Sequence, residues 1–253
     1  FMYTVAGQNE KAKDVAKDVI SKFGMRDEVS LSMGYSLLES GRLYLAGFIF
    51  SELLKKEPEN PTIHALLGEV WFKLSKYKEA QIEYSKALEI IEKSGGGPKD
   101  KQIQSVDLWY IWNNLGICYS IFGNNRDAES SFRKAMELNP IAADPHINLG
   151  VIYKRQGRFE EAQYEYEKAV SLNPNSLEAI YNLSNLHETL ASQSVMNLEK
   201  SVYHLERASN YLKIFIELET DEVKKSKALH RKDFVDKKIV DLKKKIEQRL
   251  KRQ

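Results

Sequence analysis

Small residues recur along the chain at a spacing of 34 residues, with one longer step. Gly34, Gly68, Gly116, Gly150 and Ser184 share one phase, and the steps between them are 34, 48, 34 and 34 residues. Two further series accompany this one, and they consist of Ala46, Ala80, Ala128, Ala162 and Ala208, and of Phe50, Tyr84, Phe132, Tyr166 and Leu212. Three series with a common period indicate a structural unit that is repeated along the chain.

Each unit is predicted to form two antiparallel helices. In the first helix, Leu149-Gly150 is followed one turn later by Tyr153, so a small residue lies where a neighbouring helix must approach closely. In the second helix, Ala162 and Tyr166 lie four residues apart and therefore share one face. One such pair cannot bury its apolar face alone, so the stacking of successive pairs makes the core.

Glycine and proline mark the ends of these helices. Gly123 and Gly157 lie between a first and a second helix, where a residue in the left-handed conformation ends a helix. Pro58, Pro140 and Pro174 follow second helices, in the position where proline stops a helix. Each predicted helix pair therefore has a turn and an end that can be identified in the sequence.

The pattern resembles that of the tetratricopeptide repeat (TPR) family. The matching residues are Trp112, Leu115, Gly116, Tyr119, Gly123, Ala128, Phe132, Ala135 and Pro140, and then Pro145 to Tyr153, Gly157 to Ala162, Tyr166, Ala169 and Leu172 to Pro174. The resemblance implies an all-α fold, a TPR α-solenoid in which antiparallel helix pairs form a right-handed superhelix. It also implies a role in binding other proteins.

The register divides the chain into repeats and irregular segments. Complete repeats are predicted at 27–60, 61–92, 109–142 and 143–176, and a flexible insert at 93–108. A truncated repeat, mainly a second helix, is predicted at 1–24. The C-terminal part is predicted to hold a repeat-like segment with an insert at 177–219 and a basic helix at 221–253. Because residue 1 falls inside a repeat, we expect the natural protein to continue upstream and this chain to be a fragment of it.

The longer steps place extra residues in two segments. Fourteen of them lie around 93–104, where three glycines and a proline predict a flexible surface loop. A phosphate-binding loop is not expected there, because no Gly-Lys-Ser/Thr follows the glycines. Twelve more lie near 191–199, which predicts either a longer loop or longer helices in the last repeat.

The segment after Thr220 is predicted to form one long capping helix. Its apolar stripe consists of Val235, Ile239, Leu242, Ile246 and Leu250, and such a stripe can cover the open end of a solenoid. Residues 221–253 hold 13 basic and 6 acidic residues, so the total charge of +2 combines +7 here with −5 elsewhere. A coiled-coil or anionic partner remains an alternative, through a face that carries Lys237, Lys238, Lys243, Lys244 and Lys245.

Residues with catalytic or metal-binding chemistry are few in this sequence. His64 and His146 occupy equivalent places in two repeats, where Trp112 lies in the repeat between them, and this predicts packing rather than metal ligation. His187-Glu188 lacks the following histidine of a zinc protease, and Cys118 lies within a repeat helix, as an inert thiol would. We expect no catalysis, no metal and no cofactor.

Asparagine also recurs, as Asn114, Asn148 and Asn182, at 34-residue steps. The resemblance implies that first helices line the concave side of the array, where side-chain amides can hold the backbone of an extended peptide. The same amides could instead link helices within the array, and this alternative stays open. The other groove residues implied by the register are Tyr110, Asn113, Ile117, Ile147, Val151, Lys154, Tyr181 and Asn185.

These observations predict a non-catalytic scaffold that binds an extended peptide or a partner protein in the groove. The places where chaperone-binding TPR domains hold basic residues contain Leu31, Tyr35, Tyr110 and Asn114, which disfavours that function. Alternatives are a substrate-recruiting arm of a larger enzyme such as a glycosyltransferase, self-association, and an anionic partner on the last helix. The acidic body disfavours nucleic acid.

Composition limits the class of protein further. The longest apolar run, 43–50, is shorter than the roughly 18 residues of a membrane span, so no transmembrane segment is expected. One cysteine and the lack of a recognisable secretory signal favour a cytoplasmic location.

Overall fold

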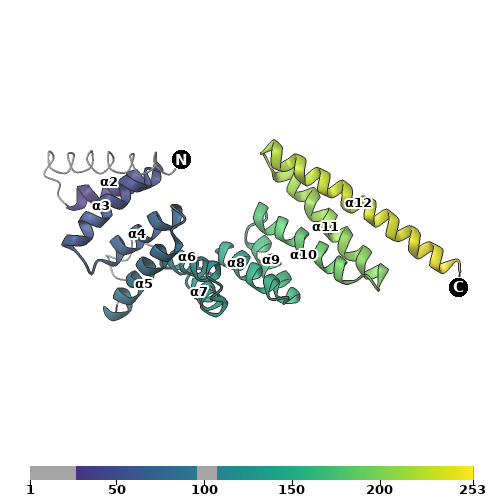
Figure 1. Ribbon diagram of the computed structural model, residues 1–253, viewed down its shortest axis with the longest axis horizontal. Helices are drawn as coiled ribbons and strands as arrows, with labels where there is room; N and C mark the ends of the chain where they lie inside the picture. The colour runs from purple at the N-terminus through teal and green to yellow at the C-terminus, as the bar shows by residue number, and fades with distance from the viewer. Residues whose placement is uncertain (1–26, 96–106, 253) are drawn as a thin grey trace. The chain divides into compact units, whose positions relative to one another are not determined.

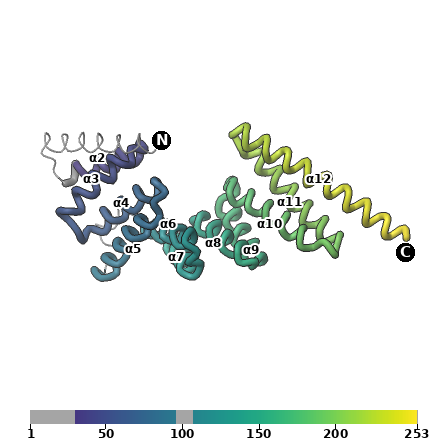
Figure 2. Tube along the Cα trace, viewed as in Figure 1, coloured from purple at the N-terminus to yellow at the C-terminus, as the bar shows by residue number. Residues whose placement is uncertain are grey.

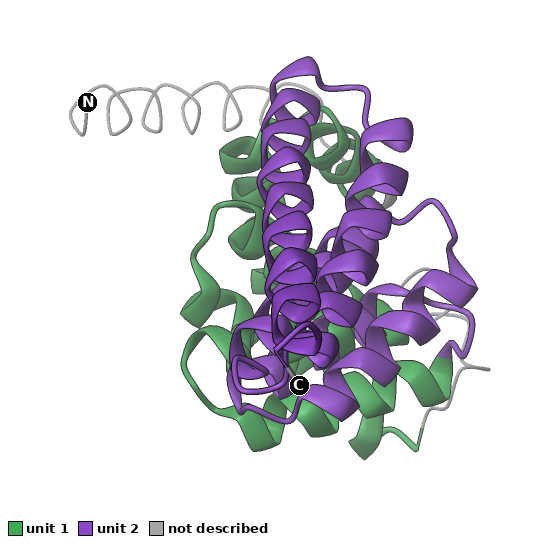
Figure 3. Ribbon diagram, turned by 90° about the vertical axis from the view of Figure 1, so that its right-hand side faces the viewer, with its two compact units in different colours: residues 1–138 green, residues 139–253 purple. Residues whose placement is uncertain are grey.

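The computed structural model describes residues 27–95 and 107–252, and these residues form eleven α-helices and no strands (Figure 1). The predicted truncated repeat at 1–24 and most of the predicted insert at 93–108 lie outside the described residues. The chain divides into two compact units, Phe1–Leu138 and Asn139–Gln253, which are coloured separately in Figure 3. The predicted all-α class is confirmed for the described residues.

The residues of the first unit that the structure describes form three helix pairs. Consecutive helices pack against each other, and the trace in Figure 2 follows them in chain order. Short turns join the two helices of each pair. The pairs are α2 (Asp27–Glu39) with α3 (Leu43–Lys56), α4 (Pro61–Lys73) with α5 (Tyr77–Lys93), and α6 (Leu108–Ile121) with α7 (Asn125–Leu138). Asn60 begins α4 by accepting hydrogen bonds from the backbone N–H groups of Thr62 and Ile63, ahead of Pro61 at the first helical position.

The second unit consists of two helix pairs and a final long helix. They are α8 (Asp144–Arg155), α9 (Phe159–Leu172), α10 (Leu177–Gln193), α11 (Leu198–Leu218) and α12 (Glu222–Leu250). The helices α10 and α11 have 17 and 21 residues, against 12 and 14 in α8 and α9. The extra residues of the last repeat therefore lengthen its helices, and only residues 194–197 lie between them.

A close contact between two side-chain positions sets the spacing of the helices within each repeat. A Cβ atom on Gly116 would lie 2.6 Å from Phe132, and one on Gly150 would lie 2.5 Å from Tyr166. These distances are far shorter than a carbon–carbon contact, so the aromatic ring of the second helix lies directly on the glycine of the first. The glycine and aromatic series of the sequence are thus the two sides of one contact.

The turns between paired helices use the left-handed conformation. Gly123 and Gly157 have φ angles of 78° and 75°, as their positions predicted. Ser75 takes the equivalent place in the preceding repeat with a φ angle of 58°, so one turn adopts this conformation without a glycine.

The last helix covers the end of the second unit, as predicted. Asp221 begins α12 by accepting hydrogen bonds from the N–H groups of Val223 and Lys224. Val235 and Ile239 are buried in a cluster with the apolar residues of α11, and α12 runs alongside α11 in Figure 1. The predicted stripe is therefore the packing face, except for Leu250, which is exposed.

A pair of histidines is buried between α10 and α11. The Nδ1 atoms of His187 and His204 lie 3.1 Å apart, so one ring must be a donor and the other an acceptor. The ring of His187 also stacks on Tyr211, with 5.7 Å between the centroids. Burial, with smaller contributions from His204 and Arg207, lowers the pKa of His187 to about 4.

The glycine contact gives a first testable prediction. In an open helix, replacing Gly150 by Ala would stabilise the chain by about 1 kcal/mol, whereas here the methyl group meets Tyr166, and we expect a loss of about 1–3 kcal/mol. Tyr166→Leu should relieve the clash, because Ser184 in the last repeat already has Leu212 at the corresponding place. Urea denaturation of both single variants and the double variant measures the coupling, and additive losses would contradict the contact.

The capping role of α12 gives a second prediction. Val235→Asp puts a charge into the cluster with α11 and should lower the free energy of unfolding by more than about 2 kcal/mol. Val240→Asp makes the same change at a half-exposed position of the same helix and should stay within about 0.5 kcal/mol. Equal effects in chemical denaturation would show that α12 does not pack as described.

The histidine pair gives a third prediction. Because the pKa of His187 is lower in the folded chain than its ordinary value, the unfolded chain binds a proton first as the pH falls below about 6.5. The contribution of His187 to the free energy of unfolding is fully present above that pH. About 2 kcal/mol of this free energy should be lost between pH 7 and pH 5. His187→Phe should reduce this loss in denaturation curves at the two pH values, and an unchanged pH dependence would refute the assignment.

Candidate functional site

The second unit presents a surface made by three helices that we call the α8–α10–α12 surface. It comprises Val151 and Lys154 of α8, Tyr181, Asn185 and Glu188 of α10, and Arg231 of α12, all partly buried. The sequence predicted the first four of these as groove residues. Glu188 and Arg231 were not predicted, although Arg231 lies four residues before Val235 and so borders the apolar stripe.

Arg231 joins α12 to α10 on this surface. Its Nε donates to Oε1 of Glu188 at 2.8 Å, and its Nη1 donates to the hydroxyl of Tyr181 at 2.7 Å. Burial disfavours the charged guanidinium, but the hydrogen bonds and charge interactions with Glu188 and Tyr181 together outweigh this, and the pKa of Arg231 is raised. The side chains of Tyr181 and Glu188 are thus held in place by the last helix.

Lys154 lies near this pair without sharing its contacts. Among the described residues, it has no hydrogen bond or ion pair. Burial lowers the pKa of its amine, the charge of Arg231 lowers it further, and Glu188 partly opposes both effects. A partly buried amine that forms no hydrogen bond or ion pair is a site at which a ligand could place a hydrogen-bond acceptor.

A pocket of about 400 Å³ opens at the N-terminal ends of α10 and α12. Four of its lining side chains are apolar or aromatic and four are charged, and they are Leu177, Tyr181, Phe215 and Ala228, and Glu178, Glu219, Lys224 and Lys227. Tyr181 belongs both to this pocket and to the α8–α10–α12 surface, so the two features adjoin. The size and the mixed lining are typical of a ligand pocket.

In the first unit, the predicted groove asparagines do not face solvent. Asn113 and Asn114 are 4% and 3% exposed. The Nδ2 of Asn114 donates to the hydroxyl of Tyr84 at 3.2 Å, which links α6 to α5 of the preceding repeat. Asn113 donates in turn to Oδ1 of Asn114, so both amides have buried partners. The alternative that the amide links helices within the array therefore describes Asn114, and the predicted groove contact does not. Tyr110 and Ile117 of the same helix are partly buried.

The equivalent asparagines in the second unit are placed differently. Asn148 and Asn182 are partly buried. Tyr166 corresponds to Tyr84 in the repeat register, yet its buried hydroxyl has no hydrogen-bond partner within the described part of the chain. The three asparagines of the series therefore share a position in the sequence but not an environment.

The lysines predicted to form one basic face on α12 are all exposed, but they point in different directions. Lys243 forms an ion pair with Glu206 of α11 at 2.7 Å, and Lys237 pairs with Asp233 of its own helix at 2.6 Å. Lys238 and Lys245 are seven residues apart and share a side, as do Lys237 and Lys244. The five lysines are consequently spread around the helix.

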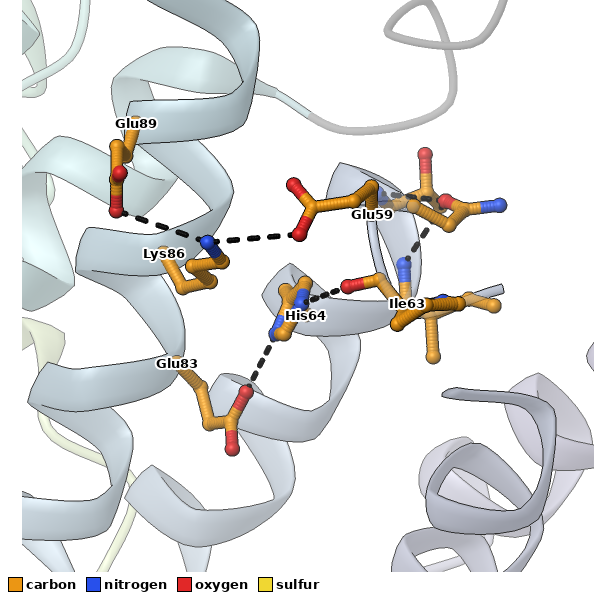
Figure 4. A network of polar contacts seen from close by, with 9 residues as sticks. Glu59, Ile63, His64, Glu83, Lys86 and Glu89 are labelled. Atoms are coloured by element: carbon orange, nitrogen blue, oxygen red, sulfur yellow. Dashed lines mark hydrogen bonds and ion pairs between the residues drawn. The ribbon is translucent and has the colours of Figure 1, made fainter. Parts of the chain in front are cut away.

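The histidines of the ordinary repeats link the two helices of one repeat. His64 Nδ1 lies 2.7 Å from Glu83 and its Nε2 lies 3.0 Å from the carbonyl of Pro58, as Figure 4 shows with the neighbouring contacts of Lys86. Burial opposes protonation, but these contacts outweigh it, and the pKa of His64 is raised. His146 repeats the arrangement, 2.6 Å from Glu165. Both histidines thus pack between helices.

The described residues hold no cluster suited to a metal ion, and their cysteine is buried. No three His, Cys, Asp or Glu side chains there are placed to hold a metal ion. Cys118 is buried, and burial raises the pKa of its thiol to about 12, so the nucleophilic thiolate is strongly disfavoured. No described helix is both long and apolar enough to cross a membrane.

Solved structures with similar folds are distant in sequence. YrrB, described as a TPR protein with an unusual peptide-binding site, is 18% identical, with a TM-score of 0.57 over 86% of this chain and 97% of its own. PilW, described as a widely conserved type IV pilus biogenesis factor, is 17% identical, with a TM-score of 0.56 over 81% and 90%. MamA from Desulfovibrio magneticus RS-1 is 17% identical, with a TM-score of 0.56 over 76% and 94%.

Family models identify the repeats directly. Three models of the tetratricopeptide repeat match residues 31–98, 110–141 and 143–176. A search of curated protein sequences finds no significant match. The matched segments comprise two of the described helix pairs and most of two others, with the glycine–aromatic contact in each, and the chain belongs to the tetratricopeptide repeat family.

Proposed function

We propose that this chain is a non-catalytic interaction module that binds an extended segment of a partner protein on the α8–α10–α12 surface. Membership of the TPR family supports a general protein-binding role. The observation that supports this particular surface is Lys154, a partly buried amine without a partner in the described chain, beside the fixed pair of Arg231 and Glu188.

The remaining side chains of the surface suit a peptide backbone. Asn185 offers an amide donor and acceptor, and Tyr181 offers an aromatic face. Arg231 holds Tyr181 and Glu188 in fixed positions, so little side-chain entropy is lost there when a partner binds. YrrB is described as having a peptide-binding site, and its fold resembles that of this chain, which is consistent with the proposal.

The proposal is tested by affinity capture of partner proteins with paired charge reversals. Lys154→Glu alters the surface, and Lys168→Glu makes the same change at an exposed position of α9. Partners captured by the unaltered chain should bind Lys168→Glu equally and Lys154→Glu about tenfold more weakly, since reversing a charge at an interface costs more than about 1 kcal/mol. Titrations with the purified partners give the affinities.

Two further results decide between binding and stability. Lys154→Glu must be as stable as Lys168→Glu in thermal melting. A loss of partner binding by Lys154→Glu then reflects the altered surface and not unfolding. Asn114→Ala should do the opposite, because it removes the hydrogen bond to Tyr84 and should lower stability by about 1 kcal/mol while partner binding is retained. Equal capture by both lysine variants would refute the α8–α10–α12 surface as the binding site.

A further inference from the structure

The pocket next to the α8–α10–α12 surface has an apolar interior with a fixed geometry. The rings of Tyr181 and Phe215 lie 5.3 Å apart and are tilted by 46°. The Tyr181 hydroxyl is held at 2.7 Å by Arg231, so this ring cannot turn to fill the space. Ala228 contributes only a methyl group to the lining. A volume of about 400 Å³ therefore stays open between three helices that are otherwise closely packed.

The charged groups that line the pocket differ in whether they already form hydrogen bonds or ion pairs within the chain. The carboxylate of Glu219 accepts hydrogen bonds from the N–H groups of Thr220 and Asp221 at 2.9 and 3.0 Å, so its charge is already stabilised by the chain. Lys224 and Lys227 are exposed and form no ion pair within the described residues. The charges of both lysines act on the carboxylate of Asp221, which accepts backbone hydrogen bonds from Val223 and Lys224. One side of the pocket thus presents two cations that form no ion pair among the described residues.

The opposite side of the pocket carries a single carboxyl group. Glu178 is the remaining carboxyl of the lining, and desolvation together with the nearby Asp144 raises its pKa. The charged form of this carboxyl is therefore less favoured than that of a fully hydrated one, whereas the two lysines on the other side are exposed to solvent. The charge distribution therefore favours a ligand that is apolar at its centre and acidic beside it.

We propose that the pocket binds a large apolar side chain of an extended peptide whose neighbouring residues are acidic, with their carboxylates placed against Lys224 and Lys227. The proposal rests on the proposed function and names the chemistry of the partner segment. Tyr181 forms a wall of the pocket and also lies on the α8–α10–α12 surface, so one peptide could cover both. Lys154, farther along that surface, would meet a second acidic group of the same segment.

Fluorescence polarisation with the full chain and three labelled ten-residue peptides tests the chemistry. Each peptide has a Gly/Ser background, and the central residues are Glu-Phe-Glu, Lys-Phe-Lys or Glu-Ala-Glu. The Glu-Phe-Glu peptide should bind at least about tenfold more tightly than the other two, because only it supplies both the ring and the carboxylates. No saturable binding of this peptide up to about 1 mM, or equal binding of all three, would overturn the proposal.

Matched charge reversals locate the site. Lys224→Glu with Lys227→Glu should weaken binding of the Glu-Phe-Glu peptide about tenfold or more. Lys244→Glu with Lys251→Glu makes the same change on exposed positions near the other end of α12 and should alter binding less than about twofold. An equal effect of the two double variants would mean that the peptide responds to net charge alone, and the pocket proposal would fail.

The apolar part of the site is tested separately. Ala228→Leu fills the pocket from α12 and should abolish binding, with thermal melting as the check on folding. If that variant is destabilised, Leu177→Ala at the partly buried start of α10 serves instead and should weaken Glu-Phe-Glu binding without changing the affinity for Glu-Ala-Glu. Unchanged binding by a folded pocket variant refutes the site.

The results separate this proposal from the proposed function. Partners lost by Lys154→Glu but retained by the pocket variants would leave the α8–α10–α12 surface as the binding site and refute the pocket. The opposite outcome would support the pocket and refute the surface as the binding site. In that case the pocket variants lose peptide binding, whereas Lys154→Glu captures partners as well as the unaltered chain does.

Discussion

The contact between a glycine on the first helix and an aromatic ring on the second sets the geometry of each ordinary repeat. Gly116 and Gly150 leave no room for a Cβ atom, because Phe132 and Tyr166 occupy that space. The helix pair is therefore closer than ordinary side chains would permit, and the spacing repeats wherever the two residues repeat. The family resemblance, the confirmed helix pairs and the stacking of each unit all depend on this one steric constraint.

The last repeat departs from this constraint, and its departures lie next to the candidate site. Ser184 replaces the glycine and donates a hydrogen bond to the carbonyl of Ala208, while Leu212 replaces the aromatic ring. Longer helices follow, and α12 packs on the apolar face of α11 that a further repeat would otherwise cover. Arg231 reaches α10 from this added helix, and the pocket opens where α10, α11 and α12 meet.

The sequence predicted the main-chain arrangement better than the site. Periodicity determines which residues share a helix face, so the helix pairs, the turns at Gly123 and Gly157 and the capping helix followed from it. It does not determine what lies opposite a side chain. Asn114 is buried because Tyr84 supplies a hydroxyl, and the lysines of α12 are divided by partners such as Glu206. Those partners lie in other helices, beyond the reach of a single-helix pattern.

The structure of the second unit shows where the basic residues of the C-terminal segment lie. The excess of basic residues after residue 220 does not form a separate basic face, because helical geometry and ion pairs disperse it. Part of it instead lies at the pocket, where Lys224 and Lys227 form no ion pair among the described residues and Arg231 holds Tyr181. A helix that only covered an apolar end would need its apolar stripe alone. The placement of these cations beside an open aromatic pocket is the basis for our proposal that α12 contributes to recognition as well as to stability.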